Sequence, residues 1–116
     1  MSAMNEIEAP LVDVRREGQV LTLTMNRPAQ FNALSEALMD ALEAELRAAG
    51  ADESVRVVVI GANGKAFCAG HDLREMQGAR NDEDDGRAAY ERLFSRCAQM
   101  MEKLPALPQP VIAEVQ

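Results

Sequence analysis

Short alternations of apolar and polar residues near the start of the chain predict a β-hairpin. Residues 12–15 alternate, residues 16–19 are polar and include a glycine, and residues 20–25 alternate again with several β-branched side chains. Such runs, separated by a turn segment, are typical of two antiparallel strands. We expect the second strand to end before Pro28, because proline cannot continue a strand ladder.

A helical period follows, and it is the most regular one in the chain. Leucines recur every four residues from Leu38 to Leu46, and alanines fill many of the positions between them. Ser35 precedes this run as a candidate N-cap, and Gly50 stands where a C′ glycine commonly ends a helix. The pattern therefore predicts an amphipathic helix between these two residues.

Residues 55–60 form a nearly continuous apolar run, which is typical of a strand covered on both faces in a parallel sheet. Residues 61–78 contain four glycines and no sustained period, and the acidic residues 81–86 predict a solvated loop. A second helix is expected to end before Pro105. Its predicted apolar face consists of Tyr90, Leu93, Phe94, Cys97, Met101 and Leu104.

Residues 111–115 form a last strand-like run, directly before Gln116 at the end of the sequence. A strand at a terminus is an unusual end for a domain. We expect that more protein follows in the gene or is removed by cleavage. The alternative is a short C-terminal edge strand.

Composition places the chain among soluble globular proteins, with 47% hydrophobic and 27% charged residues. Its 116 residues suffice for one domain or for part of one. Nineteen acidic against twelve basic residues leave a net charge of −7, which excludes a general nucleic-acid binder because such a protein needs a basic face.

Targeting signals and disulfide patterns add little. No apolar run approaches the length of about 18 residues that a membrane span requires. The polar, acidic N-terminus resembles neither a signal peptide nor an Arg-rich transit peptide. The two cysteines, Cys68 and Cys97, are too few for a disulfide scaffold. We expect a cytoplasmic protein without a membrane partner.

Residues 64–76 are the segment richest in candidate chemistry. Small residues such as Ala69 and Gly70 leave main-chain N–H groups accessible to a ligand. Asp72 and Glu75 have capping-box spacing, which predicts a helix start, and free N–H groups at a helix start favour anions. One interpretation is a site that stabilises a developing oxyanion, and the other is an ordinary glycine-rich turn between strand and helix.

His71 is the only histidine, and two roles are open for it. Its side chain has the pKa range of a general base, but no nucleophile with an orienting acid can be placed beside it. We favour a role for its backbone N–H, with the side chain merely lining the site. Cys68 is more easily explained as a small buried residue than as a nucleophile, because its only cationic neighbour in the motif is Lys65.

The sequence predicts no metal site. His71, Asp72 and Glu75 lack the i, i+4 spacing that would let two of them share an ion. The acidic loop has Gly86 in the sixth place of a calcium loop, but its twelfth place is Arg92, where calcium needs a bidentate glutamate.

Three motifs resemble the enoyl-CoA hydratase/isomerase (crotonase) superfamily. Residues 26–34 (NRPAQFNAL) resemble its "NRP…NAL" signature, and residues 65–73 (KAFCAGHDL) resemble its "KAF-small-AG-x-D-L" segment. Residues 108–115 (PQPVIAEV) are similar to its "KPVIAAV" strand. Their order, with a helix and a buried strand between them, makes the resemblance more specific than any one motif.

The resemblance implies an α/β fold: a crotonase-like spiral of β-β-α repeats, incomplete in this chain. Residues 11–116 would be the N-terminal part of the spiral domain and cover about the first two fifths of a typical member. Residues 1–10 would form a flexible N-terminus. Members of the superfamily usually assemble into homotrimers or hexamers, so the same is expected here.

The resemblance further implies a coenzyme A thioester as ligand, so that the coenzyme arrives as part of the substrate and no separate cofactor is needed. The backbone N–H at His71 would be one of two oxyanion-hole donors for the thioester carbonyl. The residues matching substrate-binding positions are Ala29, Gln30, Phe31, Ala33, Ala69, Gly70, Asp72 and Leu73.

Other parts of the family site have no counterpart among these 116 residues, namely the second oxyanion donor and the later acid and base carboxylates. We therefore expect the chain alone to be inactive. One hypothesis is that the full-length protein is an enzyme of the hydratase/isomerase type, in the lyase class. The other is a non-catalytic or degenerate module that binds acyl-CoA or self-associates.

Overall fold

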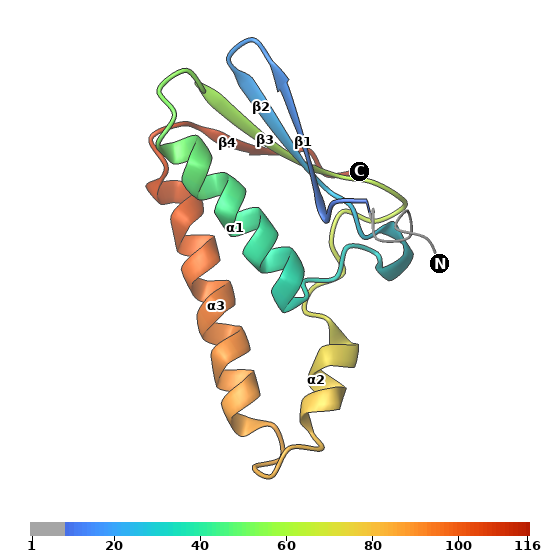
Figure 1. The fold of residues 1–116 in the computed structure, drawn as a ribbon. Helices are drawn as coiled ribbons and strands as arrows, with labels where there is room; N and C mark the ends of the chain where they lie inside the picture. Colours follow the sequence, from blue (N-terminus) through green and yellow to red (C-terminus); the bar gives the residue numbers. More distant parts are fainter. Residues whose placement is uncertain (1–8) are drawn as a thin grey trace, which may run out of the picture.

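The computed structural model describes residues 9–116 as a four-stranded sheet with α-helices packed against it (Figure 1). The expected flexible N-terminus, residues 1–10, lies almost wholly outside the described residues. In chain order the elements are β1 (Val12–Glu17), β2 (Val20–Met25), the 3-10 helix η2 (Pro28–Gln30), α1 (Glu36–Gly50), β3 (Val57–Ala62), α2 (Leu73–Ala79), α3 (Arg87–Ala106) and β4 (Val111–Ala113).

The sheet is mixed, with strand order β1-β2-β3-β4. β1 and β2 form the predicted antiparallel hairpin, and the turn is only two residues long because Gly18 adopts a φ of 60°. β3 lies parallel to both β2 and β4, which confirms the parallel arrangement expected from its apolar run. The carboxyl ends of these three strands therefore meet at one edge, where open α/β sheets place ligands.

α1 confirms the predicted helix and its predicted start after Ser35. The Ser35 hydroxyl accepts a hydrogen bond from the Leu38 N–H at 3.1 Å, so Ser35 is the N-cap. The expected role of Gly50 was wrong, because Gly50 lies inside the helix and the C-cap Ala51 is right-handed. A Cβ at Gly50 would lie 2.8 Å from Leu107 Cδ2, so a larger residue there would require the Leu107 side chain to shift.

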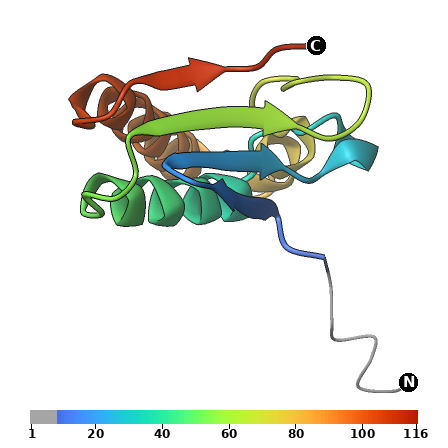
Figure 2. The same ribbon diagram turned by 90° about the horizontal axis from the view of Figure 1, so that it is seen from above.

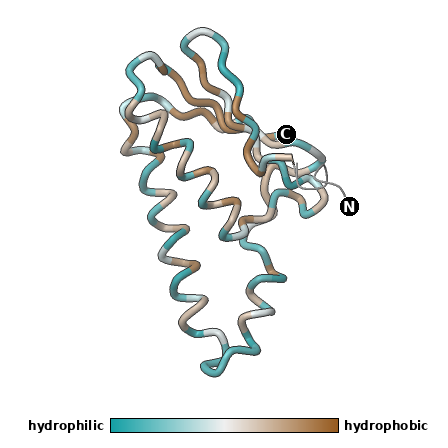
Figure 3. The backbone as a smooth tube through the Cα atoms, viewed as in Figure 1, coloured by the Kyte–Doolittle hydropathy of each residue, from teal (hydrophilic) through white to brown (hydrophobic). Residues whose placement is uncertain are grey.

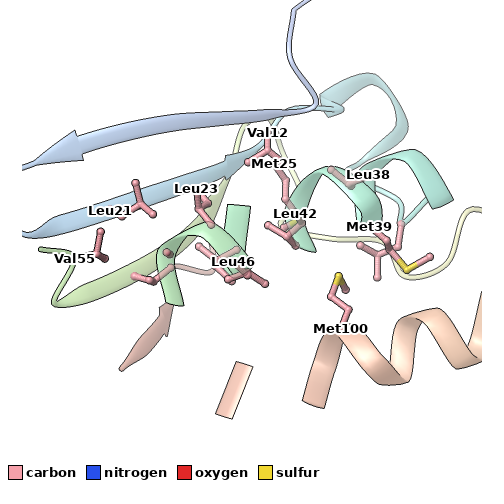
Figure 4. Packing of buried hydrophobic residues seen from close by; sticks show 14 of the residues in the cluster. Val12, Leu21, Leu23, Met25, Leu38, Met39, Leu42, Leu46, Val55 and Met100 are labelled. Atoms are coloured by element: carbon pink, nitrogen blue, oxygen red, sulfur yellow. The ribbon is translucent and has the colours of Figure 1, made fainter. Parts of the chain in front are cut away.

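α1 and α3 cover one face of the sheet, and the hydrophobic core lies between the two layers (Figures 2 and 4). β2 contributes alternate side chains, β3 contributes Val58 and Ile60, and α1 contributes its leucine stripe. Hydropathy along the backbone follows this division, with the most apolar positions in the strands (Figure 3).

The outer face of the sheet has no covering layer among the described residues. Val57 and Val59 are only half-buried, and Ile112 is exposed. The expectation that residues 55–60 are covered on both faces was therefore wrong for this chain. The run is apolar because the strand is central in a parallel sheet, but only its inner face is packed.

α3 departs from its predicted form in two ways. The helix continues through Pro105 to Ala106, since a proline in the last turn removes only one hydrogen bond. Leu93 and Met100 are its buried residues, whereas Phe94 and Met101 lie about half exposed. Only part of the predicted apolar face is therefore packed.

α2 and α3 form an arm that extends away from the sheet, joined by the loop at residues 80–86 (Figure 1). All of this loop except Gly86 is exposed, which confirms the solvated acidic loop. The described residues measure 49 × 39 × 27 Å along their principal axes, so the molecule is elongated. Among them, no helix is both long and apolar enough to span a lipid bilayer.

Candidate active site

The candidate site lies where the loop after β3 meets the segment before α1. Leu34 and His71 form a parallel bridge between these two segments. The Leu34 N–H donates to the carbonyl of Gly70 at 2.7 Å, and the Asp72 N–H donates to the carbonyl of Leu34 at 3.1 Å. Residues on either side of His71 are therefore fixed to the same partner.

This pairing determines where the main-chain N–H of His71 points. In a parallel ladder, the residue between two bonded neighbours directs its own N–H away from the partner strand. Within residues 9–116, the His71 N–H donates to no protein acceptor. The amide predicted as an oxyanion donor is thus available, and it lies two residues before the first residue of α2.

Asp72 caps α2 and forms an ion pair at the same time. Its Oδ1 accepts from the N–H groups of Arg74 (2.9 Å) and Glu75 (3.2 Å). Its Oδ2 lies 3.0 Å from Nη1 of Arg27. Burial alone would raise the pKa of Asp72, but the two N–H groups of α2 and the Arg27 guanidinium outweigh it and lower the pKa below its ordinary value.

The predicted capping box forms only in part. The Glu75 carboxylate does not return to the N-cap but accepts a hydrogen bond at 3.0 Å from the N–H of Glu36, at the start of α1. Glu36 in turn accepts from Arg92 of α3 at 3.0 Å. Glu75, which was predicted to complete the capping box at the start of α2, thus links the start of α2 to the start of α1.

Asn32 connects three segments of the site, a role that the sequence analysis missed. Its side chain is fully buried, and its backbone has a φ of 55°, a left-handed conformation that asparagine tolerates well. Its Oδ1 accepts from the Arg27 N–H, and its Nδ2 donates to the carbonyls of Asn63 and Ala66 at 2.8 and 2.9 Å. Its position in the NRP…NAL motif was the available signal.

The structure brings residues 29–33 and 69–73 together. The Ala69 N–H donates to the carbonyl of Phe31 at 3.0 Å, so the two predicted substrate-binding segments run side by side there. Phe31 is 52% exposed and Leu73 is 68% exposed, although both are apolar. Ala29 and Gln30 lie exposed in η2, so this end of the site is open to a ligand.

Two side chains close to the amide are also fixed. The His71 ring meets the ring of Phe94 on α3 edge to face, with centroids 5.4 Å apart, and its Nδ1 is buried without a partner in the described residues. The Cys68 sulfur accepts from the Gly70 N–H at 3.4 Å. Within residues 9–116, neither side chain is paired with an acid or base that would activate it.

A largely apolar cavity of about 720 Å³ opens beside these residues. Leu34, Phe67 and Cys68 from the two site segments line it, together with Met100 of α3 and Ala113 of β4. This volume lies within the range of small-molecule sites, about 300–1,000 Å³. In residues 9–116 no three His, Cys, Asp or Glu side chains come together as a metal site would require.

The fold and the site together define an α/β protein with a main-chain amide at His71 that has no acceptor within residues 9–116, and with an apolar cavity that Cys68 and the bridge partner Leu34 help to line. Residues 20–116 match the family model "Enoyl-CoA hydratase/isomerase". The chain therefore belongs to the enoyl-CoA hydratase/isomerase (crotonase) family, as the three motifs predicted.

Solved and curated relatives agree with this assignment. An enoyl-CoA hydratase of Mycobacterium smegmatis has a TM-score of 0.84 and 51% identity, covering 92% of this chain and 40% of that chain. The 2,3-dehydroadipyl-CoA hydratase of Escherichia coli strain K12 is 43% identical over 102 residues, covering 88% of this chain and 37% of the relative.

A third relative, the Xenopus laevis protein named enoyl-CoA hydratase domain-containing protein 3, mitochondrial, is 33% identical over 106 residues, covering 91% of this chain and 34% of the relative. The chain thus spans between 34% and 40% of the length of the three proteins. It represents part of the crotonase fold, as expected.

Proposed function

We propose that this chain binds a coenzyme A thioester and that the backbone N–H of His71 donates to its carbonyl oxygen. The observation that carries the proposal is this amide, which has no acceptor within residues 9–116 although its two neighbours are both bonded to Leu34. Preorganised donors of this kind stabilise the negative charge that develops on an enolate or a tetrahedral oxygen.

In this proposal the substrate follows the two adjoining segments. The exposed ring of Phe31 and the small residues Ala69 and Gly70 border the path of the coenzyme. Ala29, Gln30, Ala33 and Leu73 complete this border. Asp72 contributes by its position rather than by contact, because both of its oxygens are engaged. The apolar cavity beyond Cys68 has the volume and polarity for an acyl group.

The protein that contains this chain is proposed to be an enoyl-CoA hydratase/isomerase-type enzyme, with the chain alone inactive. The two carboxylates nearest the amide support the second point, because Asp72 pairs with Arg27 and Glu75 accepts from Glu36. Each of them therefore already has a structural partner. No cofactor is proposed besides the coenzyme that the substrate carries.

The same two engaged carboxylates favour an alternative function. A module that binds acyl-CoA without reaction needs the amide and the cavity but no acid or base.

We further propose a homotrimer or hexamer in the cytoplasm, supported by the exposed apolar residues on the outer sheet face and by the acidic composition. Sedimentation velocity and cell fractionation test these two points.

Titration of the chain with acetoacetyl-CoA tests the function. Its enolate has its own ultraviolet absorption, so the spectrum reports whether the protein stabilises the oxyanion. We expect binding to increase the enolate fraction and to shift the amide NMR resonance of His71. His71→Pro removes the N–H and should lower enolate formation about 100- to 1,000-fold, whereas His71→Ala keeps the N–H and most of the signal.

Two outcomes would contradict this assignment. If alanine abolishes the enolate as completely as proline does, the imidazole rather than the amide acts on the ligand. If acetoacetyl-CoA binds but stays in its keto form, the non-catalytic alternative holds. Crotonyl-CoA hydration by the isolated chain would contradict the proposed inactivity.

A further inference from the structure

Arg27 contacts both segments that flank the candidate amide. Its Nη1 donates to the carbonyl of Ala33 at 2.7 Å and to Oδ2 of Asp72 at 3.0 Å. Ala33 directly precedes Leu34, and Asp72 directly follows His71. One guanidinium nitrogen therefore joins the two sides of the Leu34–His71 bridge.

The surroundings make this contact a strong one. The side chains of Arg27 and Asp72 are only 17% and 10% exposed, so solvent screens the pair weakly. The backbone of Arg27 is itself fixed, because its N–H donates to Oδ1 of buried Asn32 at 2.8 Å. The Arg27 side chain thus extends from a fixed backbone position, and its guanidinium lies between the Ala33 carbonyl and the Asp72 carboxylate.

Because its two acceptors belong to Ala33 and Asp72, Arg27 affects the direction of the His71 N–H. That direction depends on the hydrogen bonds that Leu34 makes to the residues on either side of His71. Separating Ala33 from Asp72 would stretch both bonds and rotate the peptide between them. Misplacing a reacting group by about 1 Å is enough to cost about 100-fold in rate.

We propose that Arg27 is a positioning residue that orients the His71 amide by joining the Ala33 carbonyl to the Asp72 carboxylate. The inference rests on the proposed function, since it specifies what holds the oxyanion donor in place. Arg27 itself is not assigned a contact with the ligand. It acts through the two segments that it joins.

A pair of variants with a matched control tests this role in the full chain. Arg27→Met removes charge and donors while keeping an unbranched side chain, and Arg27→Lys restores both. Arg96→Met is the control, because Arg96 also pairs with a buried carboxylate, at 2.8 Å from Glu43, but between α1 and α3. The three variants and the native chain are compared by amide hydrogen exchange and by acetoacetyl-CoA enolate formation.

The exchange measurement needs no ligand. Arg27→Met should speed exchange of the Leu34 and Asp72 amides about tenfold or more relative to β2 and β3, since a hydrogen bond to a charged group contributes about 1.5–3 kcal/mol. Arg27→Lys should lie closer to the native chain. If Arg27→Met speeds exchange equally throughout the sheet, its effect is general stability and the proposal is wrong. Should that variant fail to fold, the test is whether Arg27→Lys gives a smaller acceleration that is still confined to Leu34 and Asp72 relative to β2 and β3.

The enolate measurement tests the consequence. We expect Arg27→Met to lower enolate formation about 10- to 100-fold with partial rescue by lysine, and Arg96→Met to leave it unchanged. Full enolate formation in Arg27→Met would overturn the inference and leave the proposed function intact. If the native chain itself forms no enolate, the proposed function fails, and exchange still decides whether Arg27 orders the bridge.

Discussion

Individual polar residues in this site each satisfy several partners at once. Asn32 bonds to Arg27, Asn63 and Ala66, and Asp72 bonds to Arg27 and to the first N–H groups of α2. A short motif can therefore fix a loop without a large hydrophobic contact. The consequence is that substitutions at these residues affect both stability and the site.

Asp72→Asn should make stability less dependent on pH. The pKa of Asp72 is lowered in the folded chain, so its ionised form stabilises the fold above the unfolded pKa of about 3.9, and this contribution is lost as the pH falls through the folded value. We expect the variant to lose about 1.5–3 kcal/mol near neutral pH, and the difference to shrink below about pH 4.

Urea midpoints between about pH 3 and pH 7 measure this effect. Asp13→Asn is a suitable control, because it also removes a carboxylate, but at an exposed position of β1 that forms no ion pair within the described residues. A constant difference between the native chain and Asp72→Asn over the whole pH range would contradict the role of the carboxylate charge.

At the scale of elements, two glycines differ in whether the structure requires them, either for a positive φ or for lack of space for a Cβ. Gly64 needs both a positive φ, 95°, and space, since a Cβ there would lie 2.7 Å from Pro28 Cβ. Gly78 lies in α2 and needs neither, because no atom of the described residues would come within 4 Å of its Cβ. Gly64 therefore permits the loop after β3 to approach η2, whereas Gly78 only weakens α2.

Alanine at these two positions should therefore have opposite effects. Gly64→Ala should destabilise the chain by about 2–4 kcal/mol through strain and steric overlap, whereas Gly78→Ala should stabilise α2 by about 0.5–1 kcal/mol. Thermal or urea unfolding of both variants against the native chain checks this. Equal destabilisation by the two changes would show that neither backbone angle nor space matters at Gly64.

Local patterns predicted the elements whose causes are local. The β1–β2 hairpin, α1 with its Ser35 cap, and the acidic loop were all correct because turn, cap and period act over a few residues. The burial of α3 was less predictable, since which of its apolar residues is packed depends on the tilt of the helix against α1.

The site was predicted as a segment but not as a network. Sequence identified the loop around His71, and the resemblance assigned its amide. The contacts that orient it include two between residues far apart in the sequence, Asn32 with Asn63 (31 positions) and Arg27 with Asp72 (45 positions). A local sequence pattern does not reveal contacts between residues so far apart. The roles of Arg27 and Asn32 could therefore be seen only in the structure.

For the whole molecule, the attachment of α3 is the most distinctive feature. Few of its apolar side chains are buried, but Arg96 and Lys103 both lie near the carboxylate of Glu43 on α1, and Arg96 also pairs with Asp40. Glu43 is 8% exposed, whereas Asp40 is 64% exposed. Charge therefore contributes substantially to the contact between the two helices.

Glu43→Gln should loosen α3 more than any other element. Losing the Glu43 charge weakens its hydrogen bond with Arg96 and should cost about 1.5–3 kcal/mol, while the exposed pair made by Asp40 contributes less than about 1 kcal/mol. Hydrogen exchange along α3 should accelerate in Glu43→Gln and stay nearly native in Asp40→Asn. Uniform acceleration in β2, β3 and α3 would indicate that the chain unfolds as one unit instead.

The bridge between Leu34 and His71 also bears on the order of events during synthesis. Every group that orients the amide, from Arg27 to Asp72, belongs to a stretch of fewer than fifty consecutive residues that precedes α3. Because synthesis runs from the N-terminus, this stretch emerges from the ribosome before α3 does. The donor can therefore take its final direction while the rest of the polypeptide is still being translated.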